Sequence, residues 1–293
     1  MINTSYQKYF AIGEEDKNWG LYILDCGSSF IPPGEHYPSA DHPKSYELSW
    51  NKGRILHEYQ FIYLVNGNGI FESKESGSVP IVEGTLILLF PEVWHRYKPD
   101  PETTWNTYWI GFQGEMVNSI LPKLGFTEQN PCRIIGYQDK IVRIFMDILE
   151  SSQLEFTGYQ QVMAGEVLKL FGWIYAIKKR SEFREKNIDR IMQTAKLMLI
   201  QIEQEISIEN VAEELTMSYS KFRKIFKDYT GLAPGEFRMQ HRINKATELL
   251  IENRKSIKEI SIELGFESTQ YFSRVFKKRT RYTPGNYKNR FNN

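Results

Sequence analysis

The sequence predicts an α+β protein in which an N-terminal antiparallel β-barrel with a helical hairpin precedes an all-α C-terminal domain. Short runs of β-branched and aromatic residues between residues 20 and 113 indicate the β part. Two apolar stripes at helical spacing follow, and the last hundred residues contain one pattern of apolar and capping residues written twice. With 293 residues, 41% of them hydrophobic and 14% aromatic, the chain is long enough for two domains with cores of their own.

Five short segments are predicted β-strands because they concentrate β-branched and aromatic residues. They are residues 21–24, 60–65, 69–71, 85–90 and 107–110. The run Asn66-Gly67-Asn68-Gly69 between the second and third segments is typical of a tight hairpin turn. Many short strands joined by turns are typical of a sandwich or small barrel, which we expect to span residues 1–135.

Residues 136–180 are predicted to form a hairpin of two helices. Apolar residues recur at helical spacing from Ile141 to Leu149 and from Val162 to Tyr175, with Gly158 between the stripes. Two antiparallel helices would bury one face of each against the barrel. The remaining apolar surface either packs within the chain or pairs with a second chain, and the sequence leaves both open. The charged run from Lys178 to Lys186 predicts an interdomain linker at residues 181–187.

The C-terminal domain, residues 188–293, is predicted from a repeat whose two copies lie 49 to 50 residues apart. The first copy contains Ile208, Val211, Leu215, Ser218, Phe222, Phe226, Pro234 and Phe237, and the second contains Ile257, Ile260, Leu264, Ser268, Phe272, Phe276, Pro284 and Tyr287. The apolar members of each copy fall on one face of two short helices, which must bury these faces against each other. A duplicated pair of short helices with a tight turn indicates tandem helix-turn-helix units.

Capping signals fix the ends of these helices. Ser207, Ser218 and Ser268 stand at N-cap positions, and Ser256 with Glu259 forms a capping box. Between the units, Pro234 opens a segment that continues as a helix to about residue 252. At ~1.5 Å per residue this helix is roughly 28 Å long. Successive major-groove faces on one side of B-DNA lie ~34 Å apart, so the repeat has the dimensions of a reader of two adjacent grooves.

The charge distribution also favours a DNA-binding C-terminal domain. Residues 186–293 contain 20 Lys and Arg against 13 Asp and Glu, a net charge of +7, whereas residues 1–185 contain 17 against 23, a net charge of −6. Phosphate neutralisation requires such a basic region and makes affinity fall steeply with salt. In both copies the basic residues lie off the apolar stripe, as Lys227 and Lys277 illustrate. A merely solvated surface is the alternative.

The second copy resembles the signature of the arabinose-regulator (AraC) family. The resemblance rests on the segment Gly265-Phe266-Glu267-Ser268-Thr269-Gln270-Tyr271-Phe272-Ser273-Arg274-Val275-Phe276-Lys277-Lys278, followed by Thr283-Pro284 and Tyr287. It covers about residues 188–290 and extends more weakly through the N-terminal half. The family implies a seven-helix DNA-binding domain whose third and sixth helices enter successive major grooves.

By this resemblance, two sets of residues are expected to contact bases. They are Ser220, Arg223 and Lys224 in the first recognition helix, and Thr269, Gln270 and Arg274 in the second. Arginine and lysine suit guanine O6 and N7, and glutamine suits adenine N6 and N7. Lys227 and Lys277 are expected to contact phosphates. Arg281 departs from the family pattern, which commonly has glycine there, as the first copy has Gly231.

The segment from Gly84 to His95 resembles the second half of a cupin motif, which fits the sugar-binding domain of the same family. Sugar sites combine a few planar hydrogen-bonding groups with an aromatic face in a largely apolar concavity. The expected effector-binding residues are Arg54, His95, Tyr97, Thr107 and Trp109, and His42 and His57 are secondary candidates. Each of them also has a structural reading as a core aromatic or a satisfied histidine.

Two alternatives to an effector domain remain open at this point. A cupin metalloenzyme needs about three imidazoles and a carboxylate around one ion, usually opened by a His-x-His pair. The run His57-Glu58-Tyr59 offers one imidazole, His95 offers a second far away, and His36 and His42 lie in a loop without ligand spacing. We therefore expect neither a catalytic metal nor another cofactor, and no enzymatic activity. The other alternative is a barrel that serves only for oligomerisation.

The chain is expected to act in the cytoplasm. No apolar run approaches the ~20 residues that span a bilayer, and the first residues lack the apolar core of a signal peptide. Only Cys26 and Cys132 are present, which predicts neither a disulfide framework nor a zinc site. The expected partners are a double-stranded DNA operator, a small polar effector such as a sugar, a second copy of the chain and RNA polymerase.

Overall fold

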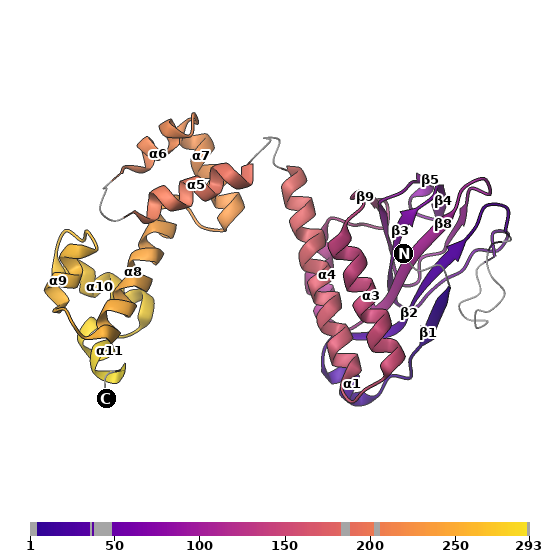
Figure 1. Cartoon of the computed structure of the whole chain (residues 1–293), viewed down its shortest axis with the longest axis horizontal. Helices are drawn as coiled ribbons and strands as arrows, with labels where there is room; N and C mark the ends of the chain where they lie inside the picture. Colours follow the sequence, from indigo (N-terminus) through magenta and orange to yellow (C-terminus); the bar gives the residue numbers. More distant parts are fainter. Residues whose placement is uncertain (1–4, 36, 38–48, 183–187, 202–205, 292–293) are drawn as a thin grey trace. The chain divides into compact units, whose positions relative to one another are not determined.

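The computed structural model describes residues 5–35, 37, 49–182, 188–201 and 206–291. The chain divides into two compact units, residues 1–182 and residues 183–293, which are described separately (Figure 1). The predicted α+β class is confirmed, with antiparallel sheets in the first unit and helices in the second.

The first unit contains two antiparallel sheets. The larger has the strand order β1-β2-β8-β3-β6-β9, and the smaller has the order β5-β4-β7. The strands are β1 (Tyr6–Tyr9), β2 (Tyr22–Ile31), β3 (Tyr59–Asn66), β4 (Gly69–Ser73), β5 (Gly77–Ile81), β6 (Thr85–Leu89), β7 (His95–Pro99), β8 (Trp105–Gln113) and β9 (Cys132–Ile134). The hairpin expected at residues 66–69 is wrong in one respect: the turn is present, but it joins β3 to β4, which belong to different sheets and do not pair.

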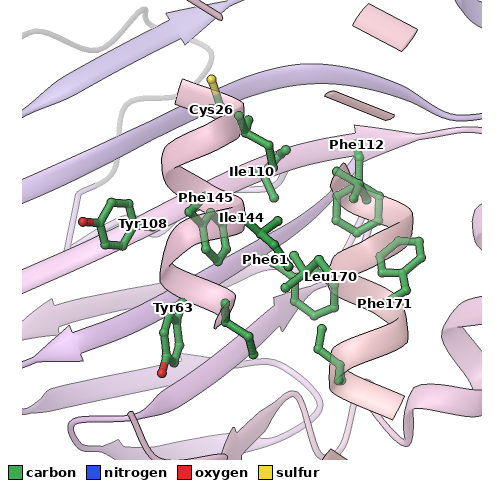
Figure 2. Packing of buried hydrophobic residues seen from close by; sticks show 14 of the residues in the cluster. Cys26, Phe61, Tyr63, Tyr108, Ile110, Phe112, Ile144, Phe145, Leu170 and Phe171 are labelled. Atoms are coloured by element: carbon green, nitrogen blue, oxygen red, sulfur yellow. The ribbon is translucent and has the colours of Figure 1, made fainter. Parts of the chain in front are cut away.

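The large sheet buries both of its faces. Along β8, Trp105 packs in an apolar cluster with Phe71 of the small sheet, whereas Tyr108 and Ile110 pack in a second cluster with helical residues. Because successive side chains of a strand point to opposite faces, odd-numbered residues of β8 face the small sheet and even-numbered ones face the helices. Figure 2 shows this helix-facing cluster, in which Phe145 lies beside Tyr108.

The helices of the first unit are α1 (Glu14–Asn18), α2 (Glu115–Leu124), α3 (Asp139–Leu154) and α4 (Tyr159–Glu182). The last two form the expected hairpin and cover one face of the large sheet (Figure 1). Their stripes are buried through Ile144, Ile148 and Phe171, but Val162 and Tyr175, which the stripe predicts to be buried, are 47% and 41% exposed.

The predicted linker begins too early. Ser181 and Glu182 still belong to α4, and Lys178 near its end donates a hydrogen bond to the carbonyl oxygen of Lys123 at 2.9 Å. The helix extends into the charged run because a basic side chain near a helix C-terminus can satisfy a neighbouring helix's free carbonyl and favours the helix dipole. The remainder of the predicted linker, residues 183–187, lies outside the described residues.

The described part of the second unit contains seven helices, the number that the family resemblance implies. They are α5 (Ile188–Ile200), α6 (Ile208–Glu214), α7 (Tyr219–Thr230), α8 (Pro234–Glu252), α9 (Ile257–Glu263), α10 (Thr269–Thr280) and α11 (Pro284–Phe291). Ser207, Ser218, Ser256 and Ser268 cap α6, α7, α9 and α10 as expected, each accepting a bond from a backbone amide three residues on.

The repeat is longer than its sequence pattern indicates, since matching contacts extend to the helices on either side. Tyr229 at the end of α7 donates to Asp189 of α5 at 3.0 Å, and the equivalent Arg279 at the end of α10 donates to Gln240 of α8 at 3.0 Å. The first helix of copy one is therefore α5, and the first helix of copy two is the later part of α8.

The earlier part of α8 plays a different role. Arg238 in α8 donates to the carbonyl oxygen of Ile206 before α6, and Lys288 in α11 donates to that of Lys255 before α9. The opening turns of α8 therefore end copy one as α11 ends copy two. One 19-residue helix serves both copies, so the two helix-turn-helix units share a rigid element.

Candidate nucleic-acid interface and effector site

The two recognition helices are held by the same packing in both copies. Phe222 and Phe226 of α7 are fully buried, as are Phe272 and Phe276 of α10. Because these pairs anchor one face of each helix, the other face lies on the surface. Six of the expected DNA contacts are exposed on α7 and the body of α10, namely Ser220, Arg223, Lys224, Lys227, Arg274 and Lys277, and Gln270 is exposed in the first turn of α10.

Thr269 differs from the other expected base contacts. Its side chain is half-buried, and its hydroxyl lies 3.4 Å from that of the buried Ser261, which can donate to it. The position is the first residue of α10, where it joins the turn between α9 and the recognition helix. Arg274 lies on the exposed face with its guanidinium 5.5 Å from the Tyr271 ring centre, so its charge is presented to solvent. Each recognition helix, α7 and α10, therefore presents at least three exposed basic side chains.

Arg281 takes the same backbone conformation as glycine in the first copy. Both Gly231 and Arg281 cap their helices in the left-handed region, with φ of 80° and 70°. The two caps also share a side-chain hydrogen bond: Thr230 donates to the carbonyl oxygen of Phe226, and Thr280 donates to that of Phe276. The departure from the family pattern therefore leaves the end of α10 in place, but a side chain in this region costs about 1 kcal/mol relative to glycine.

In the first unit, the structure brings three of the five expected effector-binding residues together. Arg54 donates from Nε to Nε2 of His95 at 3.1 Å and from Nη2 to the hydroxyl of Tyr97 at 3.1 Å. The Nδ1 atom of His95 faces the carbonyl oxygen of Val93 at 3.1 Å. Since Nε2 accepts from arginine, the proton of the neutral imidazole is on Nδ1. Burial, together with the nearby arginine charge, lowers the pKa of His95 to about 3.

Two residues that the sequence analysis missed complete this network. Arg54 also donates to Oε1 of Gln60 at 3.2 Å, and Gln60 in turn donates to Oδ1 of Asp25 at 2.9 Å. Asp25 and Gln60 are 0% and 2% exposed, although each stands within an apolar strand. A polar residue at an inward position of a buried strand must be hydrogen-bonded, and that was the available signal. We call Asp25, Arg54, Gln60, His95 and Tyr97 the barrel network.

The carboxyl of Asp25 is held in an unusual state. Burial raises its pKa to about 7, and the neighbouring Glu58 acts in the same direction. Arg54 and hydrogen bonds from Gln60 and Trp109 oppose this rise. Its Oδ2 atom, among the described residues, has no hydrogen-bond partner and lies 1.9 Å from where a Cβ on Gly111 would stand. Glycine at that strand position therefore makes the space that the carboxyl occupies.

The other two expected residues lie farther along β8. Trp109 faces the small sheet and reaches Asp25, and its ring occupies the space that a side chain at Gly27 would need. Thr107 is 3% exposed and lies two residues before Trp109, on the same face of β8. It forms no side-chain hydrogen bond with a described residue, so the structure does not join it to the barrel network.

Of the secondary histidine candidates, His57 lies within the described residues and does not enter the network. His57 is on the surface, where its Nδ1 lies 2.5 Å from Oε1 of Glu92, and that contact raises its pKa. His36 and His42 lie outside the described residues. Within the described chain, no three His, Cys, Asp or Glu side chains cluster as a metal site would require. No described helix has the length and apolar character to cross a membrane.

The structure thus combines two basic recognition helices on matched scaffolds with a separate barrel that holds a buried polar network. This combination defines a DNA-binding transcriptional regulator with an N-terminal ligand-binding domain. Residues 211–290 match the model of a helix-turn-helix domain, and residues 50–195 match that of the AraC-like ligand binding domain. The chain belongs to the AraC family of regulators.

Three relatives illustrate this membership. The Msm operon regulatory protein of Streptococcus mutans is 25% identical, over 88% of this chain and 93% of its own. The lactose operon transcription activator of Staphylococcus xylosus is 21% identical, over 92% of each chain. The arabinose operon regulatory protein of Escherichia coli is 26% identical, over 81% of this chain and 80% of its own. All three relatives are operon regulators by name, and each match covers most of both chains.

Proposed function

We propose that the DNA-binding activity of this regulator is controlled by a small, polar, uncharged effector, most simply a sugar, bound at the barrel network. The observation that carries the proposal is the chain of hydrogen bonds from Asp25 through Gln60 and Arg54 to His95 and Tyr97 between the two sheets. Planar donors and acceptors beside the aromatic ring of Trp109 are the groups that recognise sugar hydroxyls. Two of the relatives carry a sugar operon in their names, which supports the same class.

An uncharged effector is favoured by the electrostatics of the network. A buried anionic ligand would face Asp25 and Glu58, and a buried cation would face Arg54. A hydroxylated neutral molecule can accept from Arg54 and donate to Asp25 without an unpaired buried charge. The effector can shift the regulator between states only through its differential affinity for them.

A thermal-shift screen with arabinose, galactose, glucose and lactose tests the effector proposal, because a ligand of the native state raises the melting temperature by mass action. We expect one of them to stabilise the protein and the shift to be lost in Tyr97→Phe, which removes the hydroxyl that Arg54 contacts. Tyr22→Phe, on the same unit but outside the network, is the matched control and should keep the shift. If no compound stabilises the protein at saturating concentration, the barrel is better explained as an oligomerisation module.

For the DNA-binding domain, we propose that the exposed basic residues divide into base readers and phosphate contacts. Arg274→Ala should weaken binding to the operator more than binding to random DNA, by about 1–3 kcal/mol. Lys277→Ala, one helical turn away, should weaken both about equally and reduce the salt dependence. Gel-shift titrations at two salt concentrations measure both effects. Equal losses from the two substitutions would contradict the role of Arg274 as a base reader.

We further propose a cytoplasmic homodimer that recruits RNA polymerase. Support for the dimer comes from exposed apolar residues on the helical hairpin, where Met146, Leu154, Val162 and Tyr175 are 40%, 66%, 47% and 41% exposed. The first two lie on α3 and the other two on α4, and exposed apolar surface commonly marks protein interfaces. Light scattering of the protein and of Val162→Glu tests this: the variant should be monomeric at concentrations where the parent is a dimer.

A further inference from the structure

A cavity lies on the opposite face of the large sheet from the barrel network. It has a volume of about 400 Å³ and opens between β3, β8 and the first turns of α3. Val65, Asn106 and Tyr108 form its buried floor, and Val142 and Arg143 of α3 border it. Cavities of roughly 300–1,000 Å³ hold small-molecule ligands. We call this space the α3 cavity.

The floor of the α3 cavity contains a tyrosine whose hydroxyl is not used by the fold. Tyr63 and Tyr108 are direct partners in the ladder between β3 and β8, and both rings stack on Phe145. The hydroxyl of Tyr63 donates to the carbonyl of Gly136 at 2.7 Å and accepts from the amide of Gln138 at 2.9 Å. That of Tyr108 has no hydrogen-bond partner in the described chain, and in Figure 2 it points away from the packed residues.

Asn106 lies two residues before Tyr108 on β8, on the same helix-facing side of the sheet. Its residue is only 4% exposed, yet its side-chain amide forms no hydrogen bond with any residue that the structure describes. Both side chains line the cavity, and neither is among the buried side chains left without a partner, so their polar atoms can hydrogen-bond water or a ligand there. Burial also raises the pKa of Tyr108, so its hydroxyl keeps its proton and can both donate and accept. Phenylalanine and leucine would serve a purely structural floor.

The border of the cavity indicates which ligands fit. Arg143 stands on one side, and the carboxylates of Glu83 and Asp139 stand on others, all exposed. Charges of both signs disfavour a purely anionic or cationic ligand but suit hydroxyl groups, which accept from a guanidinium and donate to a carboxylate. The aromatic ring of Tyr137, 51% exposed, also lines the cavity and offers an apolar surface.

We propose that the α3 cavity is a second small-molecule site that binds a neutral polyhydroxylated compound of monosaccharide size. It is separate from the barrel network, because even-numbered residues of β8 face the cavity and odd-numbered ones face the barrel interior. A ligand held by Asn106 and Tyr108 would also contact Val142 and Arg143, so it would join the sheet to the helix that presents Met146. The proposal does not depend on whether the barrel network binds an effector.

Isothermal titration of the full-length protein with glucose, galactose, arabinose and xylose tests the proposal. We expect at least one to bind, and Tyr108→Phe to weaken it about tenfold, the effect of losing one good hydrogen bond to the ligand. Tyr22→Phe is the control: it removes a hydroxyl that bonds Gln113 on the same unit, outside both sites, and the affinity should stay within about twofold. Arg143→Ala, at an exposed position on the border of the cavity, should also weaken binding.

The outcomes separate this site from the barrel. If a sugar binds and its affinity is lowered by Tyr97→Phe but unchanged by Tyr108→Phe and Arg143→Ala, the α3 cavity proposal is overturned while the barrel proposal stands. If affinity falls in the cavity variants and not in Tyr97→Phe, the cavity proposal stands and the barrel proposal fails. Two binding events, each lost in its own variant, support both sites. No heat of binding from any of the four sugars at millimolar concentration overturns the cavity proposal.

Discussion

Replacing Asp25 by asparagine should make the first unit more stable at neutral and higher pH. Asparagine keeps an oxygen that can accept from Gln60 and exchanges Oδ2, which has no hydrogen-bond partner among the described residues, for an amide. It also removes a carboxyl whose pKa is raised by burial to about 7. The substitution therefore removes a buried charge at pH 8 and leaves the surrounding hydrogen bonds in place.

The pH dependence follows from linkage. An acid whose folded pKa lies above its unfolded value contributes most below the unfolded value, here 3.8, and its contribution is lost as pH rises through about 7. The variant and the parent should therefore be about equally stable near pH 4 and should diverge up to about pH 7. The two pKa values set a ceiling of about 4 kcal/mol on the difference, and relaxation around the carboxyl reduces what is observed to about 1–3 kcal/mol.

His95 acts in the opposite direction and makes the comparison with the parent essential. Its folded pKa of about 3 lies below its usual 6.5, so its contribution to stability is lost as pH falls below that usual value. The slopes of the two groups oppose each other over much of the acidic range, so the pH profile of the parent alone combines both contributions. The difference between variant and parent isolates the contribution of Asp25.

Tryptophan fluorescence during urea unfolding measures this difference in the intact chain. All six tryptophans lie in the first unit, so the signal reports that unit alone. A variant that is less stable than the parent at pH 8, or a difference that stays constant from about pH 4 to 8, would refute the reasoning.

Three further predictions concern the stability of the second unit. Its unfolding can be measured by circular dichroism, because the described part of this unit contains helices and no strands. Arg281→Gly should raise its stability by about 1 kcal/mol by relieving the left-handed cap, and a drop instead would mean that the side chain makes a compensating contact. Phe272→Ala, at a fully buried position, should cost about 3–5 kcal/mol and abolish operator binding. Ser256→Ala removes a capping box and should cost about 1 kcal/mol, with Ser273→Ala on the helix interior as a control that costs less.

The sequence predicted the elements whose signals are local. The caps at Ser256 and Ser268 and the apolar stripes of α7 and α10 each depend on residues within a few positions, and the structure has them where the pattern placed them. The strands that it missed, such as β5 and β7, are short, and β5 contains Pro80 and exposed residues. β5 pairs with the adjacent β4 across a tight turn, whereas β7 pairs with β4 from beyond β6, which no local pattern reports.

The missed members of the candidate sites share a physical cause. Asp25 and Gln60 are polar residues inside apolar strands, and the hydrogen bond between them joins positions 35 residues apart in the sequence. Their inward direction depends on strand register, which one residue of slippage would reverse. The same dependence hides the α3 cavity, since the alternation along β8 places Asn106 and Thr107 on different faces although they are adjacent in sequence.

The shared helix α8 decides what kind of operator the second unit can read. Phe226 of α7 packs on Phe237 in the earlier part of α8, and Phe276 of α10 shares a core with Leu250 in its later part. One 19-residue helix therefore holds both recognition helices. Arg279 strengthens this link by pairing with Glu236 at 2.7 Å in the part of α8 that belongs to copy one. The exposed positions nevertheless differ, because Ser220 and Lys224 are replaced by Gln270 and Arg274 at the equivalent places. A single chain should therefore read two unlike segments in adjacent grooves, and exchanging those segments within an operator should weaken binding even though every base is retained.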